Sequence, residues 1–221
     1  MLRYIITLKI LIAITLYYNF TYTLTLSRDF ITIHYTETVT LRWLNFMSDK
    51  NRVFKANFTI ADLREHRNHK EVFTTACDRR ESYQHFVLKL LSYCLFSHNE
   101  TAIMNARFSH AEPDVSIKAL DDHYQTWLAV DQPDILQLNK IAKRVDELWV
   151  VTTLNNDWLK ENEHQLELIN NGHLIAFDDN FIEQLASHLT KNLQWDVTID
   201  QQMVSVSDKE NFYQTSQLIW H

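Results

Sequence analysis

The sequence predicts an α/β fold for residues 47–221, with a mixed sheet flanked by helices. Between residues 124 and 190, short apolar runs typical of strands alternate with segments of helical periodicity, the order expected of strand–helix–strand units. The runs at 147–153 and 173–177 lack polar alternation, as do strands that are buried on both faces of a sheet. No repeat, low-complexity tract or linker interrupts the stretch, so we expect one domain.

The elements before residue 124 are predicted from their periodicity. Residues 53–60 alternate apolar and polar side chains, and residues 71–76 follow after a polar connection at 61–69, which predicts a β-hairpin. The segment 82–97 predicts a helix with one apolar stripe, because its apolar side chains recur at helical spacing. These side chains are Tyr83, Phe86, Val87, Leu90, Leu91 and Cys94.

The later elements follow from apolar runs and helix-start signals. Pro133 suits the first turn of a helix that reaches about Arg144. Asn180 with Glu183 predicts a capping box before a helix that ends near Thr190. The remaining predictions are a helix at 157–169 and strands at 124–130, 147–153, 173–177, 196–199 and 203–206.

Residues 1–46 are a different kind of sequence, apolar, rich in Thr and poor in charge. Residues 18–26 alternate in the manner of a strand. The apolar run after Arg3 is similar to a signal peptide, but Lys9 interrupts it and no typical cleavage site follows. The run is also shorter than the ~20 apolar residues that span a bilayer. We therefore expect no membrane attachment and a cytoplasmic location.

Cysteine content and charge limit the possible functions. Cys77 and Cys94 form no Cys-x-x-Cys pair, which favours two reduced, buried thiols over a disulfide. The net charge of the chain is −7, and the first 46 residues hold four basic and two acidic side chains. The rest therefore has 17 basic and 26 acidic residues, a net charge of −9. Such a domain repels phosphate at long range, so strong non-specific DNA binding is not expected, although a local basic patch is compatible with it.

Six short segments, in order, make residues 47–221 resemble the YaeQ family. They are Val53-Phe54-Lys55-Ala56 with Ala61-Asp62-Leu63, Leu88-Lys89-Leu90-Leu91, Glu112-Pro113-Asp114, Trp127, Gln132-Pro133-Asp134 before Lys140, and Phe177-Asp178-Asp179. The resemblance implies a bacterial protein whose core is similar to that of restriction endonucleases of the PD-(D/E)XK type. It also implies a partner that is a nucleic acid or a transcription-related protein. The oligomeric state is not predicted.

The start of the chain has three explanations. Met47-Ser48-Asp49-Lys50 resembles the amino terminus of a YaeQ-type protein, so our first hypothesis is that translation starts at Met47 and that residues 1–46 come from a misassigned upstream start. A signal or anchor segment and a true extension are the alternatives. The mass of the intact native protein distinguishes a start at Met47 from one at Met1.

The resemblance also implies four candidate site residues. Cleavage of a phosphodiester by this core needs carboxylates that hold Mg²⁺ and a cation that offsets charge on the phosphate. Glu81 and Lys140 match the catalytic positions, and Asp114 matches the metal-binding Asp. Asp114 is equally compatible with a loop residue that caps a short helix, and Lys140 with a solvated lysine near a helix carboxyl end.

Several positions depart from the family pattern of acidic–x–Trp–x–acidic–x–Gly–x–Pro–Asp. Gln125 and Ala129 replace its two carboxylates, and Asp131 replaces its Gly. In the early helix, Gln84-His85 stands where the family has Glu and Arg. Asp131 is either a displaced metal ligand or, as we favour, a residue at the start of the following helix.

These losses favour a non-catalytic module with a binding or regulatory role. The alternative is a Mg²⁺-dependent nuclease rebuilt from Glu81, Asp114, Asp131 and Lys140. No cofactor other than Mg²⁺ is implied. A zinc site at His66 and His69 is not favoured, because no second His or Cys pair at zinc spacing accompanies them.

Overall fold

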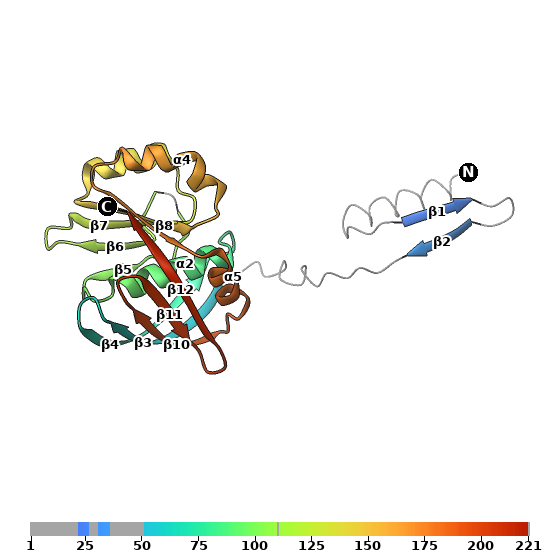
Figure 1. Ribbon diagram of the computed structural model, residues 1–221, viewed down its shortest axis with the longest axis horizontal. Coiled ribbons are helices and arrows are strands. Elements are labelled where there is room, and N and C mark those ends of the chain that lie inside the picture. The colour runs from blue at the N-terminus through green and yellow to red at the C-terminus, as the bar shows by residue number, and fades with distance from the viewer. Residues whose placement is uncertain (1–21, 27–30, 36–50, 110, 221) are drawn as a thin grey trace. The chain divides into compact units, whose positions relative to one another are not determined.

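The computed structural model describes residues 22–26, 31–35, 51–109 and 111–220 (Figure 1). Contacts divide the chain into two compact units, Met1–Met47 and Ser48–His221. In the first unit, β1 (Tyr22–Leu26) pairs antiparallel with β2 (Ile31–Tyr35). The strand expected at 18–26 is therefore found from Tyr22 onward, and residues 18–21 lie outside the described part, as does the apolar run before them. No helix in the described residues has the length and hydropathy to cross a bilayer.

The second unit contains one ten-stranded mixed sheet, in the order β4-β3-β10-β11-β12-β9-β8-β7-β6-β5. Its strands are β3 (Arg52–Asp62), β4 (Arg67–Cys77), β5 (Ala102–Met104), β6 (Val115–Lys118), β7 (Tyr124–Val130), β8 (Glu147–Thr153), β9 (Gly172–Phe177), β10 (Asn192–Ile199), β11 (Met203–Ser207) and β12 (Phe212–Trp220). Its helices are α2 (Tyr83–Phe96), α3 (Ile135–Ile141) with a 3-10 turn at Ala142–Arg144, α4 (Asp157–Glu167) and α5 (Asp179–Ser187). The predicted α/β class is confirmed, and β7, β8 and β9 are parallel neighbours as expected.

The long strand β12 joins the two halves of the sheet. Its first part pairs antiparallel with β11, and its last residues pair antiparallel with β9 (Figure 1). The half formed by β3, β4, β10 and β11, in which β3 and β10 are parallel, thereby becomes continuous with the half that carries the parallel strands β7, β8 and β9.

Two hydrophobic cores lie against the sheet, and they explain why helices cover both faces. The larger core joins apolar residues of α2 and α5 to Phe54, Ala56, Phe58 and Ile60, the alternate residues of β3 that are buried. The smaller core joins Leu138 of α3 and apolar residues of α4 to β7, β8 and β9. The central parallel strands contribute to both cores, which is why their sequences lack polar alternation.

Helix α2 is held at both ends by side chains. Ser82 is the N-cap, and its hydroxyl accepts a 3.0 Å hydrogen bond from the backbone N–H of His85. At the carboxyl end, Arg64 donates from Nη2 to the carbonyl of Leu95 at 2.6 Å. The same guanidinium makes two hydrogen bonds to the carboxylate of Asp62, which is only 1% exposed. The predicted helix is confirmed, and the β-hairpin fixes its direction.

Several boundaries differ from the predictions. The polar connection expected at 61–69 is wrong, because β3 and β4 pair until Asp62 and Arg67 and leave a tight turn in which His66 has φ 51°. The capping box at Asn180 is also wrong. Asp178 caps α5 instead, since its carboxylate accepts from the N–H of Phe181 at 3.1 Å. Strands β2, β5, β6 and β12 were not predicted.

Candidate functional site

Three ionisable residues spaced four apart lie together at the start of α2. Glu81 precedes the N-cap, His85 is in the first turn and Lys89 is in the second. All three are buried, at 2%, 6% and 0% exposure. Because they are buried, the charges of Glu81 and Lys89 depend on neighbouring groups for stabilisation.

The carboxylate of Glu81 is fully engaged by the protein. Its Oε1 lies 2.7 Å from Nδ1 of His85 and 2.6 Å from Nζ of Lys89. Its Oε2 accepts a 3.1 Å hydrogen bond from the backbone N–H of Asp78. Burial opposes ionisation of Glu81, but the hydrogen bond from His85 and the charge of Lys89 outweigh it and hold the pKa below the ordinary value.

Asp114 faces the same cluster from the sheet. It directly precedes β6, and its Oδ2 accepts a 2.9 Å hydrogen bond from the backbone N–H of Val130 on β7. Its Oδ1 lies 3.7 Å from Nε2 of His85, so the imidazole stands between two carboxylates. Burial raises the pKa of Asp114, against the lowering effect of the charges on His85 and Lys89. The alternative, that Asp114 caps a short helix, is wrong, because its carboxylate accepts from a backbone N–H of β7 and the residue precedes a strand. We call Glu81, His85, Lys89 and Asp114 the charge cluster.

Asp131 is a turn residue at the end of β7. Its φ of 68° lies in the left-handed region, which explains why the family pattern has Gly at this position. The expectation that Asp131 starts a helix is wrong, because Asp134 is the N-cap of α3 and accepts from the N–H of Gln137 at 2.9 Å. Burial raises the pKa of Asp131, and the charge of His85 offsets this only in part.

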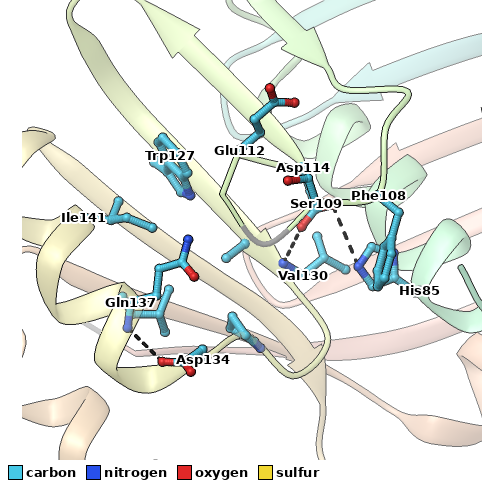
Figure 2. Close-up of a pocket in the computed structure, with 13 residues that line it drawn as sticks. His85, Phe108, Ser109, Glu112, Asp114, Trp127, Val130, Asp134, Gln137 and Ile141 are labelled. Atoms are coloured by element: carbon cyan, nitrogen blue, oxygen red, sulfur yellow. Dashed lines mark hydrogen bonds and ion pairs between the residues drawn. The ribbon is translucent and has the colours of Figure 1, made fainter. Parts of the chain in front are cut away.

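A small pocket opens beside the charge cluster. Figure 2 shows it between the loop that carries Phe108, Ser109 and Glu112, the strand β7 and the helix α3. His85 and Asp114 form one wall, and Trp127 and Gln137 lie opposite. Its volume, ≈ 30 Å³, is enough for about one water molecule.

The four candidate residues do not all converge. Glu81 and Asp114 both contact His85, and His85 lowers the pKa of Asp131 electrostatically. Lys140 is exposed in the last turn of α3 and lines an adjoining groove together with Arg144. Gln84 and Gln125 are exposed. Ala129 reaches the pocket without a polar group.

The donor set does not fit Mg²⁺. Both oxygens of Glu81 and one oxygen of Asp114 are taken by protein N–H groups or by Lys89. Among the described residues, no group of three or more His, Cys, Asp or Glu side chains is arranged to hold a metal ion. His66 and His69 do not form a pair of zinc ligands. Nε2 of His69 lies 2.8 Å from Oγ of Ser97, and His66 lies in the hairpin turn.

His85 and Lys89 belong to the charge cluster, although the family pattern did not indicate them. His85 stands at a position that departs from the family pattern, and Lys89 lies in a segment that carries the resemblance. A signal was present, however. Lys89 lies four residues after His85 and eight after Glu81, and the three side chains meet at the start of α2.

The comparisons with known proteins agree with this fold. The YaeQ protein family model matches residues 47–217. The uncharacterized protein YaeQ of Escherichia coli K12 is 19% identical over 179 residues, which cover 79% of this chain and 98% of the relative. The uncharacterized protein YaeQ of Shigella flexneri matches with the same values.

Two solved structures share the architecture. The crystal structure of YaeQ from Pseudomonas syringae has a TM-score of 0.73 and 21% identity, over 79% of this chain and 98% of that one. The crystal structure of YaeQ from Xanthomonas axonopodis pv. citri has a TM-score of 0.71 and 19% identity, over 77% and 98%. Because the family model covers most of the chain, this protein belongs to the YaeQ family.

Proposed function

We propose that residues 47–221 form a non-catalytic binding module, in which internal cations neutralise the carboxylates that a nuclease would use for metal. The observation that carries this proposal is the engagement of Glu81, whose Oε1 contacts His85 and Lys89 at 2.7 and 2.6 Å inside the core. A nuclease needs such carboxylates open to a hydrated ion.

The energetics support the same proposal. A divalent ion at Glu81 would have to displace the ammonium of Lys89, which is completely buried and has Glu81 as its ion-pair partner. An unpaired buried charge costs roughly 3–5 kcal/mol. A site with one or two remaining carboxylates binds Mg²⁺ too weakly to offset that cost, because Mg²⁺ gives up its water reluctantly.

The alternative is a Mg²⁺-dependent nuclease that uses Glu81, Asp114, Asp131 and Lys140. The proximity of Asp114 and Asp131 to His85 favours a shared electrostatic site. The nucleic-acid or transcription-related partner and the cytoplasmic location stay predictions.

A cleavage assay separates the two functions. Plasmid, duplex and single-stranded substrates are incubated with Mg²⁺ or Mn²⁺ and the full chain, the Asp114→Ala variant or the Asp157→Ala variant. Asp157 is an exposed acid on α4 and serves as the matched control. We expect no cleavage that depends on Asp114. Metal-dependent cleavage that is kept in Asp157→Ala and lost in Asp114→Ala would overturn the proposal.

A further inference from the structure

A groove adjoins the pocket on the outer side of α3. Its main lining residues are Tyr124 and Trp127 of β7, Gln137 and Lys140 of α3, and Arg144 of the 3-10 turn. We call it the α3 groove. Trp127 and Gln137 line both hollows, so the groove continues into the pocket beside Asp114. The groove volume is ≈ 600 Å³, within the range of small-molecule sites.

The α3 groove is basic in an acidic chain. Lys140 and Arg144 are exposed, four residues apart, and neither forms an ion pair with any residue that the structure describes. The carboxylate of Asp134, which also lines the groove, is used to cap α3. Nζ of Lys118 lies 4.6 Å from the ring centroid of Tyr124, but it also pairs with Asp122 at 3.9 Å and does not line the groove. Two unpaired cations on adjacent turns favour a phosphate group.

The aromatic residues of the groove favour a ring in the ligand. Tyr124 and Trp127 pack edge to face, with ring centroids 4.9 Å apart, and Tyr124 is the more exposed of the two. A ligand in the groove would thus meet both cations and aromatic side chains. A nucleoside phosphate carries both an anion and an aromatic base.

We propose that the α3 groove binds a nucleoside monophosphate, with its phosphate on Lys140 and Arg144 and its nucleoside along Tyr124 and Trp127. The inference rests on the proposed function, since it names the ligand class of a module that binds without cleaving. A small ligand is favoured over a polymer, because the net charge of −7 repels a polyanion while the groove supplies only a local positive field.

Calorimetric titration of the full chain in EDTA tests the proposal. The probes are the four ribonucleoside monophosphates, adenosine, inorganic phosphate and a short single-stranded oligonucleotide. The variants are Lys140→Gln, Arg144→Gln and the control Lys143→Gln, which removes an exposed cation that does not line the groove. Far-ultraviolet circular dichroism checks that each variant is folded.

We expect at least one monophosphate to bind, and to bind about tenfold more tightly than adenosine or phosphate alone. Lys140→Gln and Arg144→Gln should each weaken it about five- to tenfold, as for a lost charge-assisted hydrogen bond, and Lys143→Gln less than twofold. The absence of binding, equal effects of all three variants, or tighter binding of the oligonucleotide would each overturn the inference. Cleavage in the metal-dependent assay would instead overturn the proposed function, because these titrations contain no free metal.

Discussion

At the residue scale, Lys89 determines the chemistry of the site. An ammonium with no exposed surface is tolerated only where a carboxylate balances it, and Glu81 does so at 2.6 Å. The same contact removes Glu81 from any role as a metal ligand. One ion pair therefore links the stability of the core to the proposed loss of catalysis.

The substitution Lys89→Met should destabilise the domain by about 3 kcal/mol, because it removes the buried ammonium that balances the buried carboxylate of Glu81. The double variant Lys89→Met with Glu81→Gln should recover about half of that loss or more, since no charge is then left unpaired. Urea unfolding measures both free energies. Lys160→Met, which alters an exposed pair with Asp157, should change stability by less than about 0.5 kcal/mol. Equal stability of Lys89→Met and the wild type would contradict the account of this ion pair.

Asp131→Asn should stabilise the domain by about 0.5–1 kcal/mol at neutral pH. Asn tolerates a φ of 68° as well as Asp does, and it removes a carboxylate whose pKa is raised by burial. At a lower pH, nearer the raised pKa of Asp131, the benefit should shrink, because more of the folded protein is then protonated at Asp131. Thermal or urea unfolding at the two pH values measures this, and a benefit that does not depend on pH would show that burial of the charge is not its cause.

At the element scale, the hairpin turn secures the carboxyl end of α2. Arg64→Ala should cost about 2–3 kcal/mol, because it leaves the buried carboxylate of Asp62 and the carbonyl of Leu95 without this guanidinium. Arg80 provides a matched control, since it also pairs with an Asp two residues earlier but is 64% exposed. Arg80→Ala should cost less than about 0.5 kcal/mol in the same urea unfolding experiment. Similar losses for both variants would refute the role of burial.

Elements with a strong local pattern could be predicted, and those fixed by distant pairing could not. The apolar stripe of α2 and the continuous apolar run of β8 predicted the correct element types. The spacing of apolar residues reflects burial of one face in the helix and of both faces in the strand. Strand β12 carries a polar run at Gln214, Thr215 and Ser216 and is held by pairing with β11 and β9, which no local window contains. The candidate site shows the same limit. The resemblance indicates Glu81 and Asp114, whereas their contacts with His85 and Lys89 arise from tertiary packing and could not be predicted.

At the scale of the whole molecule, buried carboxylates with opposite pKa shifts shape the dependence of stability on pH. Glu81 and Asp62 have lowered pKa values, so their contribution is present above the unfolded carboxyl pKa and is lost as the pH falls through their folded values. Asp114 and Asp131 have raised pKa values, so their ionised forms oppose folding at neutral pH and this penalty is relieved as the pH falls.

The free energy of unfolding should therefore rise as the pH falls from 7 toward the raised pKa values of Asp114 and Asp131, and fall at still lower pH, where Glu81 and Asp62 become protonated. Urea unfolding across this range measures the curve, and Asp131→Asn should flatten its rise. A steady decrease from pH 7 downward would contradict the assignment of Asp114 and Asp131.

The most direct measurement is a calorimetric titration of the intact chain with Mn²⁺ at neutral pH, beside the Asp114→Asn variant. If Lys89 and His85 neutralise the charge cluster, the wild type should show no site tighter than about 1 mM, and the variant should behave in the same way. A micromolar site that disappears in Asp114→Asn would show that the carboxylates are open to metal, and the central claim would be wrong.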